Sequence, residues 1–141
     1  AQERTARGRA TATKRKEPVI EWARTVPIAL RRVSCAELES SVIRWWNTSM
    51  ERQADSDALP TDEMMPRMKV NHLRHQCSNY ERLLDRRAKE PGVVEARWIV
   101  RERIYAAIAK AYPDLASEAA AQLARRRAED PHAADRYPPH A

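Results

Sequence analysis

Residues 70–88 read VNHLRHQCSNYERLLDRRA, and this stretch decides the fold class. Its apolar side chains recur at intervals of three and four residues, at Val70, Leu73, Cys77, Tyr80 and Leu84. This is the spacing of one face of an α-helix, because a helical turn takes 3.6 residues. The pattern predicts one continuous amphipathic helix that begins near Pro66, runs to about Lys89 and stops at Pro91-Gly92.

Helical signals also mark the segments on either side. Ser34 and Glu37 form a capping box, which predicts an amphipathic helix directly after it. Residues 93–111 carry a second apolar face that ends at Pro113, and residues 115–128 form a last, Ala-rich helix. Upstream, Pro18 and Pro27 each suit the first position of a short helix, although an extended segment through 26–33 is the alternative.

No segment alternates apolar and polar residues long enough to predict a sheet. The sequence therefore predicts an all-α fold, a small helical bundle of three longer helices plus one or two short N-terminal helices. Three regions follow from composition: a disordered basic arm over 1–16, one domain over 17–128, and an irregular Pro-rich tail over 129–141.

The core is expected to be small, because the chain has only 22 Val, Leu and Ile residues and no Phe. The side chains predicted to be buried are Cys35, Val42, Trp46, Leu73, Cys77, Tyr80, Leu84, Val100, Ile104 and Ile108. Trp45 and Trp46 both fall in the apolar sector of their helix. We therefore interpret them as core anchors rather than as platforms on which bases stack.

Composition excludes several function classes. Gly8 and Gly92 are the only glycines, so the chain has no glycine-rich loop to hold a phosphate or dinucleotide and no Gly-flanked serine elbow. Cys35 and Cys77 lack a CxxC spacing, and two reduced thiols are expected, as in a cytoplasmic protein. No apolar run reaches 18 residues, and the Arg-rich N-terminus lacks an apolar core, so neither a membrane span nor a secretory signal is expected.

Positive charge is concentrated in two places. Residues 1–16 hold six basic side chains and one acidic one, and residues 67–89 hold seven basic and two acidic. Residues 17–66 hold five basic and nine acidic side chains, so this segment could fold back and neutralise the basic helix. Without that neutralisation, the arrangement favours a polyanionic partner.

The polar face of the predicted helix carries a row of His75, Asn79, Arg82 and Arg86. Arg and Asn are the residue types that recognise guanine and adenine edges, and Arg and His contact phosphate. Such a row could bind nucleic acid. It could equally be the solvated face of an amphipathic helix, or a face that contacts a protein partner.

A metal centre and a catalytic pair are not expected in this helix. His72 and His75 fall on the side of the helical wheel opposite Cys77, so these three cannot form a Cys–His site together. No other segment supplies an obvious set of ligands. We therefore expect no enzymatic activity, no metal and no cofactor.

The sequence thus predicts a small basic nucleic-acid-associated protein, or a subunit of a nucleoprotein assembly. The alternative is a helical adaptor that binds a protein and does not contact nucleic acid. Expected partners are DNA or RNA together with a protein partner or a second copy, but no membrane. The candidate nucleic-acid-binding residues are Arg4, Arg7, Arg9, Lys14, Arg15, Lys16, His75, Asn79, Arg82 and Arg86.

Overall fold

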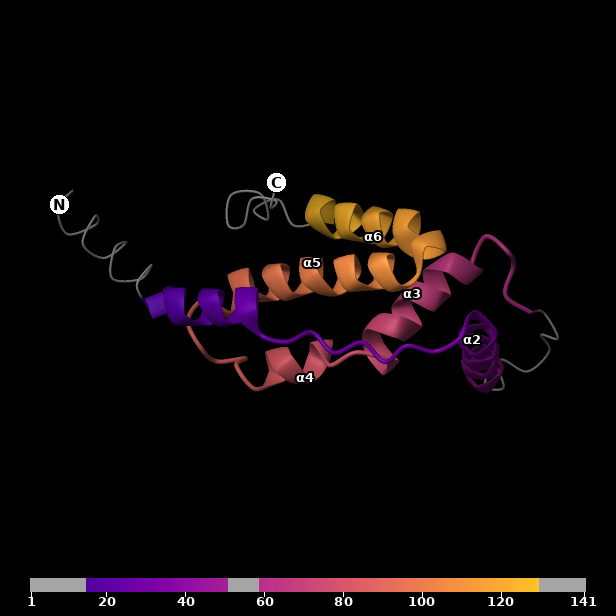
Figure 1. Cartoon of the computed structure of the whole chain (residues 1–141), viewed down its shortest axis with the longest axis horizontal. Helices are drawn as coiled ribbons and strands as arrows, with labels where there is room; N and C mark the ends of the chain where they lie inside the picture. The colour runs from indigo at the N-terminus through magenta and orange to yellow at the C-terminus, as the bar shows by residue number, and fades with distance from the viewer. Residues whose placement is uncertain (1–14, 51–58, 130–141) are drawn as a thin grey trace.

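The computed structural model describes residues 15–50 and 59–129, and this part of the chain is all-α, which confirms the predicted class (Figure 1). The helical elements are a helix over 15–25, α2 (Cys35–Met50), α3 (Met65–Gln76), α4 (Tyr80–Asp85), α5 (Val93–Ala111), the 3₁₀ turn η1 (Pro113–Leu115) and α6 (Ala116–Glu129). Within the described ranges no helix has the length and hydrophobicity needed to cross a bilayer.

Helix α5 is the centre of the fold. It buries side chains around most of its circumference, namely Ala96, Trp98, Ile99, Val100, Ile104, Tyr105 and Ile108. A helix that presents apolar side chains on most of its sides must be covered by several neighbours. Helix α6 runs alongside it, and α3 and α4 also pack against it (Figure 1). The predicted helix over 93–111 is therefore confirmed, and the one over 115–128 is displaced by a single residue.

The helix over 15–25 runs parallel to the first half of α5. Lys16 Nζ lies 3.0 Å from Glu95 Oε1, and about two helical turns further on Arg103 Nη1 donates to the carbonyl oxygen of Ala23 at 2.8 Å. Gly92 precedes α5 with φ of +90°, and a Cβ atom there would lie 2.9 Å from the carbonyl oxygen of Lys16. Glycine is thus required both by the backbone conformation and by the close approach of this helix.

The predicted boundary of the basic arm is wrong at its C-terminal end. Arg15 and Lys16 are helical, so the folded domain includes them. The remaining arm residues, Arg4, Arg7, Arg9 and Lys14, lie outside the described residues. Glu129, the first residue of the predicted tail, belongs to α6, and the rest of that tail lies outside the described residues.

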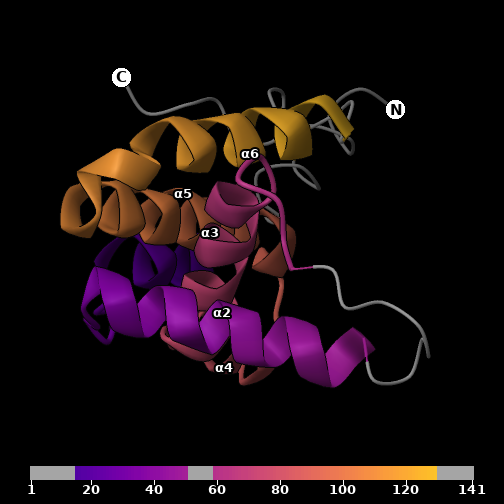
Figure 2. The same ribbon diagram turned by 90° about the vertical axis from the view of Figure 1, so that its right-hand side faces the viewer.

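Helix α2 is seen nearly end-on in Figure 1, where α5 and α6 run horizontally, so α2 lies across their direction. It packs mainly on α3, in front of which it lies in Figure 2. The Ser34 hydroxyl accepts a hydrogen bond from the Glu37 amide at 3.1 Å, as the capping prediction requires. Among residues 35–49 of this helix, for which burial is described, only Leu38 and Val42 are buried, because a crossing helix offers a narrow contact stripe. The prediction that Cys35 is buried is therefore wrong: its side chain is exposed.

The two adjacent tryptophans of α2 are also less buried than predicted. Trp46 is partly buried, and Trp45 is 56% exposed. Their interpretation as core anchors is wrong for Trp45. The other eight residues predicted for the core are buried.

The single helix predicted from Pro66 to Lys89 is wrong, because the chain leaves the helix at residues 77–79 and resumes as α4. The extended segment 26–34 pairs with residues 77–79. The Arg31 amide donates to Cys77 O at 2.7 Å, and the Asn79 amide donates to Ala29 O at 3.2 Å. The Ser78 hydroxyl donates to the carbonyl oxygen of Arg74. Ser and Asn side chains compete for backbone partners in this way and favour breaks in helices. The prediction of an extended segment over 26–33 is confirmed, and the alternative of a second short helix beginning at Pro27 is wrong.

We expect Ile104→Ala to lower the free energy of unfolding by about 2–5 kcal/mol, because the side chain is fully buried on α5 and its loss leaves a cavity. Urea denaturation followed by circular dichroism measures this. The matched control is Val94→Ala on the same helix, where 39% exposure predicts a change within about 0.5 kcal/mol. Equal losses in the two variants would contradict the placement of α5.

Candidate functional site

A cleft opens between α3 and α6, beside the end of α2. It encloses about 490 Å³ and is lined by Trp45, Arg67, Asn71, Arg74, His75, Gln122, Arg125, Arg126 and Glu129. Four of these side chains are arginines and one is a carboxylate, so we call it the cationic cleft. Because α3 and α6 both pack on α5, arginines that are about 50 residues apart in the sequence meet here.

Arg74 is the least exposed of these arginines, at 5%. Its Nη2 lies 2.9 Å from His75 Nε2, and its guanidinium carbon lies 6.0 Å and 5.7 Å from the ring centroids of Tyr80 and Tyr105. Its Nε–H is buried without an acceptor, and within the described ranges no carboxylate pairs with it. Two aromatic faces stabilise the cation only in part, because burial of an unpaired charge is costly.

Gln122 fixes the two walls of the cleft to each other and to α5. This buried amide donates to the carbonyl oxygen of Arg67 at 3.4 Å and to Glu118 Oε1 at 3.1 Å, and it accepts from the Tyr105 hydroxyl at 3.2 Å. Burial raises the pKa of Tyr105, although Arg74 opposes the shift, so the phenol keeps its proton and remains a donor. These buried and partly buried hydrogen bonds therefore join α3, α5 and α6 at the cleft.

His75 connects Arg74 to Glu81 of α4. The guanidinium of Arg74 can only donate, so His75 Nε2 must accept and Nδ1 carries the proton that is donated to Glu81. This chain of contacts orients the ring at the cleft, although the side chain is exposed. His75, one of the candidate nucleic-acid-binding residues, thus lines the cationic cleft.

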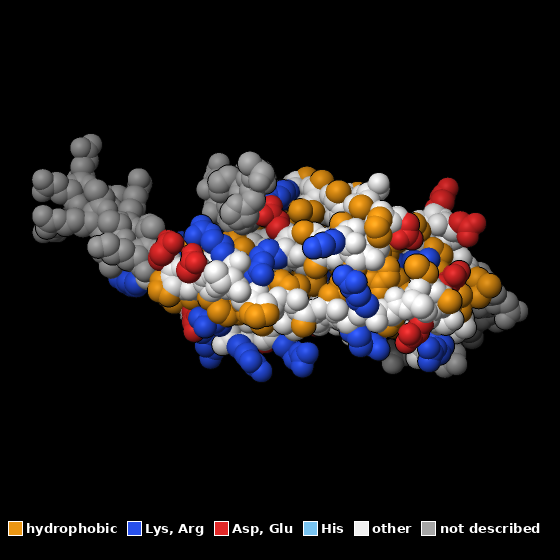
Figure 3. All heavy atoms as spheres, viewed as in Figure 1, with side chains coloured by type: hydrophobic (Ala, Val, Ile, Leu, Met, Phe, Trp, Pro, Cys, Tyr) orange, Lys and Arg blue, Asp and Glu red, His pale blue; other side chains and the backbone are white. Residues whose placement is uncertain are grey.

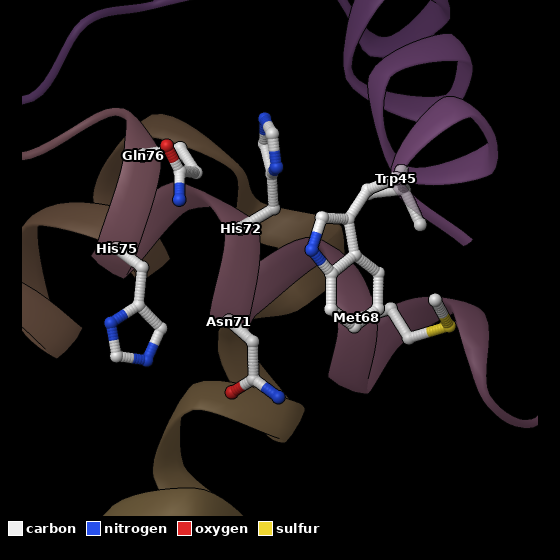
Figure 4. A pocket seen from close by; sticks show the side chains of 7 residues that line it. Trp45, Met68, Asn71, His72, His75 and Gln76 are labelled. Carbon is white, nitrogen blue, oxygen red and sulfur yellow. The ribbon is translucent and has the colours of Figure 1, made fainter. Parts of the chain in front are cut away.

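A second, smaller hollow lies between α2 and α3. It encloses about 210 Å³ and is lined by Val42, Trp45, Met68, Asn71, His72, His75 and Gln76. In Figure 4 the Trp45 ring reaches from α2 towards Met68 on α3, while His72 projects from α3 on the side opposite Asn71 and His75. We call this the Trp45 hollow. It shares Trp45, Asn71 and His75 with the cationic cleft, so the two are adjacent.

His72 is the titratable group of the Trp45 hollow. Desolvation by burial lowers its pKa below the usual 6.5, and the positive charge of Arg31 lowers it further. The ring is therefore neutral at pH 7.

The predicted row of His75, Asn79, Arg82 and Arg86 does not form one helical face, because α3 and α4 are separate helices. The Asn79 side chain is used within the fold: its Oδ1 accepts from the Ala29 amide at 2.9 Å, and its Nδ2 donates to the carbonyl oxygen of Pro27 at 3.1 Å. Arg82 and Arg86 remain exposed, one turn apart. Lys and Arg side chains gather along the edge of the molecule that α4 forms (Figure 3).

Two of the predicted arm residues, Arg15 and Lys16, lie in the helix over 15–25. Lys16 is paired with Glu95, whereas Arg15 is exposed. Asp62 and Glu63, which lie in the described half of the acidic loop, form no ion pair with α3 or α4 there. The structure describes no group of three or more His, Cys, Asp or Glu residues that could hold a metal ion, within residues 15–50 and 59–129.

Sequence reasoning missed Arg67, Arg74, Gln122 and Trp45 as site residues. The run Arg125–Arg127 lies at the end of α6, where the helix dipole favours cations, so the sequence alone favours a helix-terminus signal over a binding patch. The structure divides that run: Arg125 and Arg126 line the cleft, whereas Arg127 pairs with Glu102 and stacks on Trp98. The run of three arginines was the only sequence signal for the α6 wall.

Comparison with known proteins gives no further guidance: no family model, no curated sequence and no solved structure matches this chain.

We expect Asn79→Ala to destabilise the fold by about 1–2 kcal/mol, because it removes both side-chain hydrogen bonds that hold segment 26–34 against the break between α3 and α4. Chemical denaturation measures the loss. Arg82→Ala, three residues further on and exposed, is the control and should change stability by less than about 0.5 kcal/mol. A larger loss for Arg82→Ala than for Asn79→Ala would contradict this assignment.

We expect His72 to make stability depend on pH. Its pKa is lowered in the folded state, so below pH 6.5 the unfolded chain binds the proton more readily. The contribution of His72 is therefore fully present above pH 6.5 and is lost as pH falls through the folded-state pKa. Denaturation of the wild type and His72→Gln between pH 7.5 and 5 isolates this effect, and parallel curves would show that His72 does not contribute.

Proposed function

We propose that this protein binds nucleic acid through the phosphate backbone, with the cationic cleft as its main contact surface. Arg67 and Arg126 stand exposed on opposite walls, and Arg74 lies deeper between them. Phosphate oxygens suit this set, because guanidinium groups donate paired hydrogen bonds to them. Repeated phosphates along a strand also match a protein whose net charge is +6.

The observation that carries the proposal is the buried state of Arg74. Arginine is almost never fully buried in proteins unless it is paired, and here Nε–H has no acceptor in the described part of the chain. A bound anion in the cleft supplies negative charge next to this cation. The proposal thus explains why a buried charge is retained beside three other arginines.

Two further basic regions extend the proposed interface. Arg82 and Arg86 on the α4 edge are exposed, and the arm residues Arg4, Arg7, Arg9 and Lys14 carry additional positive charge. Contacts of this kind add affinity without base preference, because they are made to phosphates. The proposal covers both DNA and RNA.

The second candidate function is that of a helical adaptor for a protein partner. It is favoured by the exposure of Trp45 beside the apolar side chains of Val42 and Met68, since exposed aromatic side chains are enriched at protein interfaces. The arginines of the cleft distinguish the two candidates, because only the nucleic-acid function needs them.

We expect the double substitution Arg67→Ala and Arg126→Ala to weaken binding of a labelled 20-nucleotide strand. Each lost phosphate contact should flatten the slope of log affinity against log salt by about 0.7 for single strands and about 0.9 for duplex. Fluorescence anisotropy from 50 to 300 mM salt measures both quantities. Both residues are exposed, so the thermal midpoint should not change.

The charge-matched control is the double substitution Arg97→Ala and Lys110→Ala on α5. Both side chains are exposed and neither lines the cleft. The salt slope should stay close to that of the wild type. If the two double variants lose affinity equally, binding depends on net charge alone and the cleft has no special role. A third variant lacking residues 1–14 measures the contribution of the arm separately.

A further inference from the structure

We infer that the cationic cleft and the Trp45 hollow together accept a single-stranded nucleic acid, with an unpaired base stacked on Trp45 and the neighbouring phosphate held by the arginines. This inference rests on the proposed function and specifies which form of nucleic acid binds.

The exposure of Trp45 is the first observation. At 56% it is the more exposed of the two adjacent tryptophans of α2, although its ring reaches towards α3 (Figure 4). Exposed aromatic rings beside a basic groove are the platforms on which single-stranded nucleic acids stack, because every base has a π face. The indole is therefore placed where a flat ring can cover it.

The size and lining of the Trp45 hollow are the second observation. Its volume of about 210 Å³ is below the range of about 300–1,000 Å³ typical of pockets for drug-sized ligands, so it suits one flat ring system. Val42 and Met68 supply apolar contacts, whereas Asn71, His72 and Gln76 supply polar groups at its wall. A nucleobase has this combination of flat faces and polar edges.

The adjacency of the two sites is the third observation. Trp45, Asn71 and His75 line both, so a ligand on the indole is next to the arginines of the cleft. In a nucleotide the flat base and the charged phosphate likewise lie close to each other. In a duplex the bases are stacked and paired inside the helix, and their faces cannot reach an indole without unstacking. The arrangement therefore favours a single strand over a duplex.

The test uses the full 141-residue chain and four labelled probes of 12 nucleotides: oligothymidylate, oligouridylate, an abasic strand with the same phosphates, and a duplex. The wild type is compared with Trp45→Ala, with Trp45→Phe, and with Leu59→Ala as a control that removes another exposed apolar side chain (62%). Anisotropy gives the affinities, and quenching of tryptophan fluorescence reports stacking.

We expect the wild type to bind the base-containing strands more tightly than the abasic strand or the duplex. Trp45→Ala should weaken binding of the base-containing strands about 5- to 100-fold, the range for loss of one base–aromatic stack. It should leave the abasic strand and the duplex unchanged. Trp45→Phe should recover most of the affinity, and Leu59→Ala should have no effect. The comparison of the two base-containing strands shows whether the thymine-containing deoxyribose strand or the uracil-containing ribose strand binds more tightly, and oligodeoxyuridylate separates the effect of the sugar from that of the thymine methyl group.

Equal binding of abasic and base-containing strands, or a uniform loss with Trp45→Ala on all four probes, would overturn the inference. The proposed function would survive that result if the Arg67 and Arg126 double variant still weakens every probe. If no probe binds, and Trp45→Ala instead alters sedimentation of the protein, both statements fall and the adaptor function replaces them.

Discussion

The burial of α5 around most of its circumference is the constraint on which the rest of the structure depends. The chain has few large aliphatic residues and no Phe, and α5 alone buries Trp98, Ile99, Val100, Ile104 and Ile108. Every neighbouring element must therefore direct its own apolar stripe towards this helix. Helices α3 and α6 both pack their apolar sides on α5, and polar side chains of the two helices therefore lie next to each other at the cleft. The cationic cleft is a consequence of that geometry.

The central position of α5 also accounts for the burial of Arg74. The side chain extends from α3 to Tyr105 of α5 and to Tyr80 of α4, where aromatic faces replace part of its lost hydration. Tyr105 in turn fixes Gln122 of α6, so one buried network joins a charged side chain to both walls. A buried cation with incomplete compensation lowers stability, and a small core can tolerate this only at a limited number of positions.

The sequence predicts those parts of the fold that local signals determine, and the discrepancies have identifiable physical causes. Ser34 and Pro113 mark the helix ends correctly, because capping and proline act within a few residues. The break at 77–79 was missed because the helical wheel assumes a constant 100° per residue, whereas Cys77 and Asn79 form hydrogen bonds with an extended segment about 50 residues away. The site was missed for the same reason: its walls come from α2, α3 and α6, and only the folded chain brings them together.

Net charge alone is a weak argument for a nucleic-acid partner, since much of it is used inside this fold. Arg103 binds a backbone carbonyl, Arg101 and Arg127 lie over Trp98, and Lys16 pairs with Glu95. These side chains serve packing, as long amphipathic residues commonly do. The cations of the cationic cleft are paired less completely. Arg125 pairs with Glu118, whereas Arg67, Arg74 and Arg126 form no ion pair within the described residues. All four line one surface with a single carboxylate, Glu129, among the lining residues. Their position next to an exposed indole distinguishes this surface from the rest of a basic protein and directs attention to a ligand that joins an anion to a flat ring.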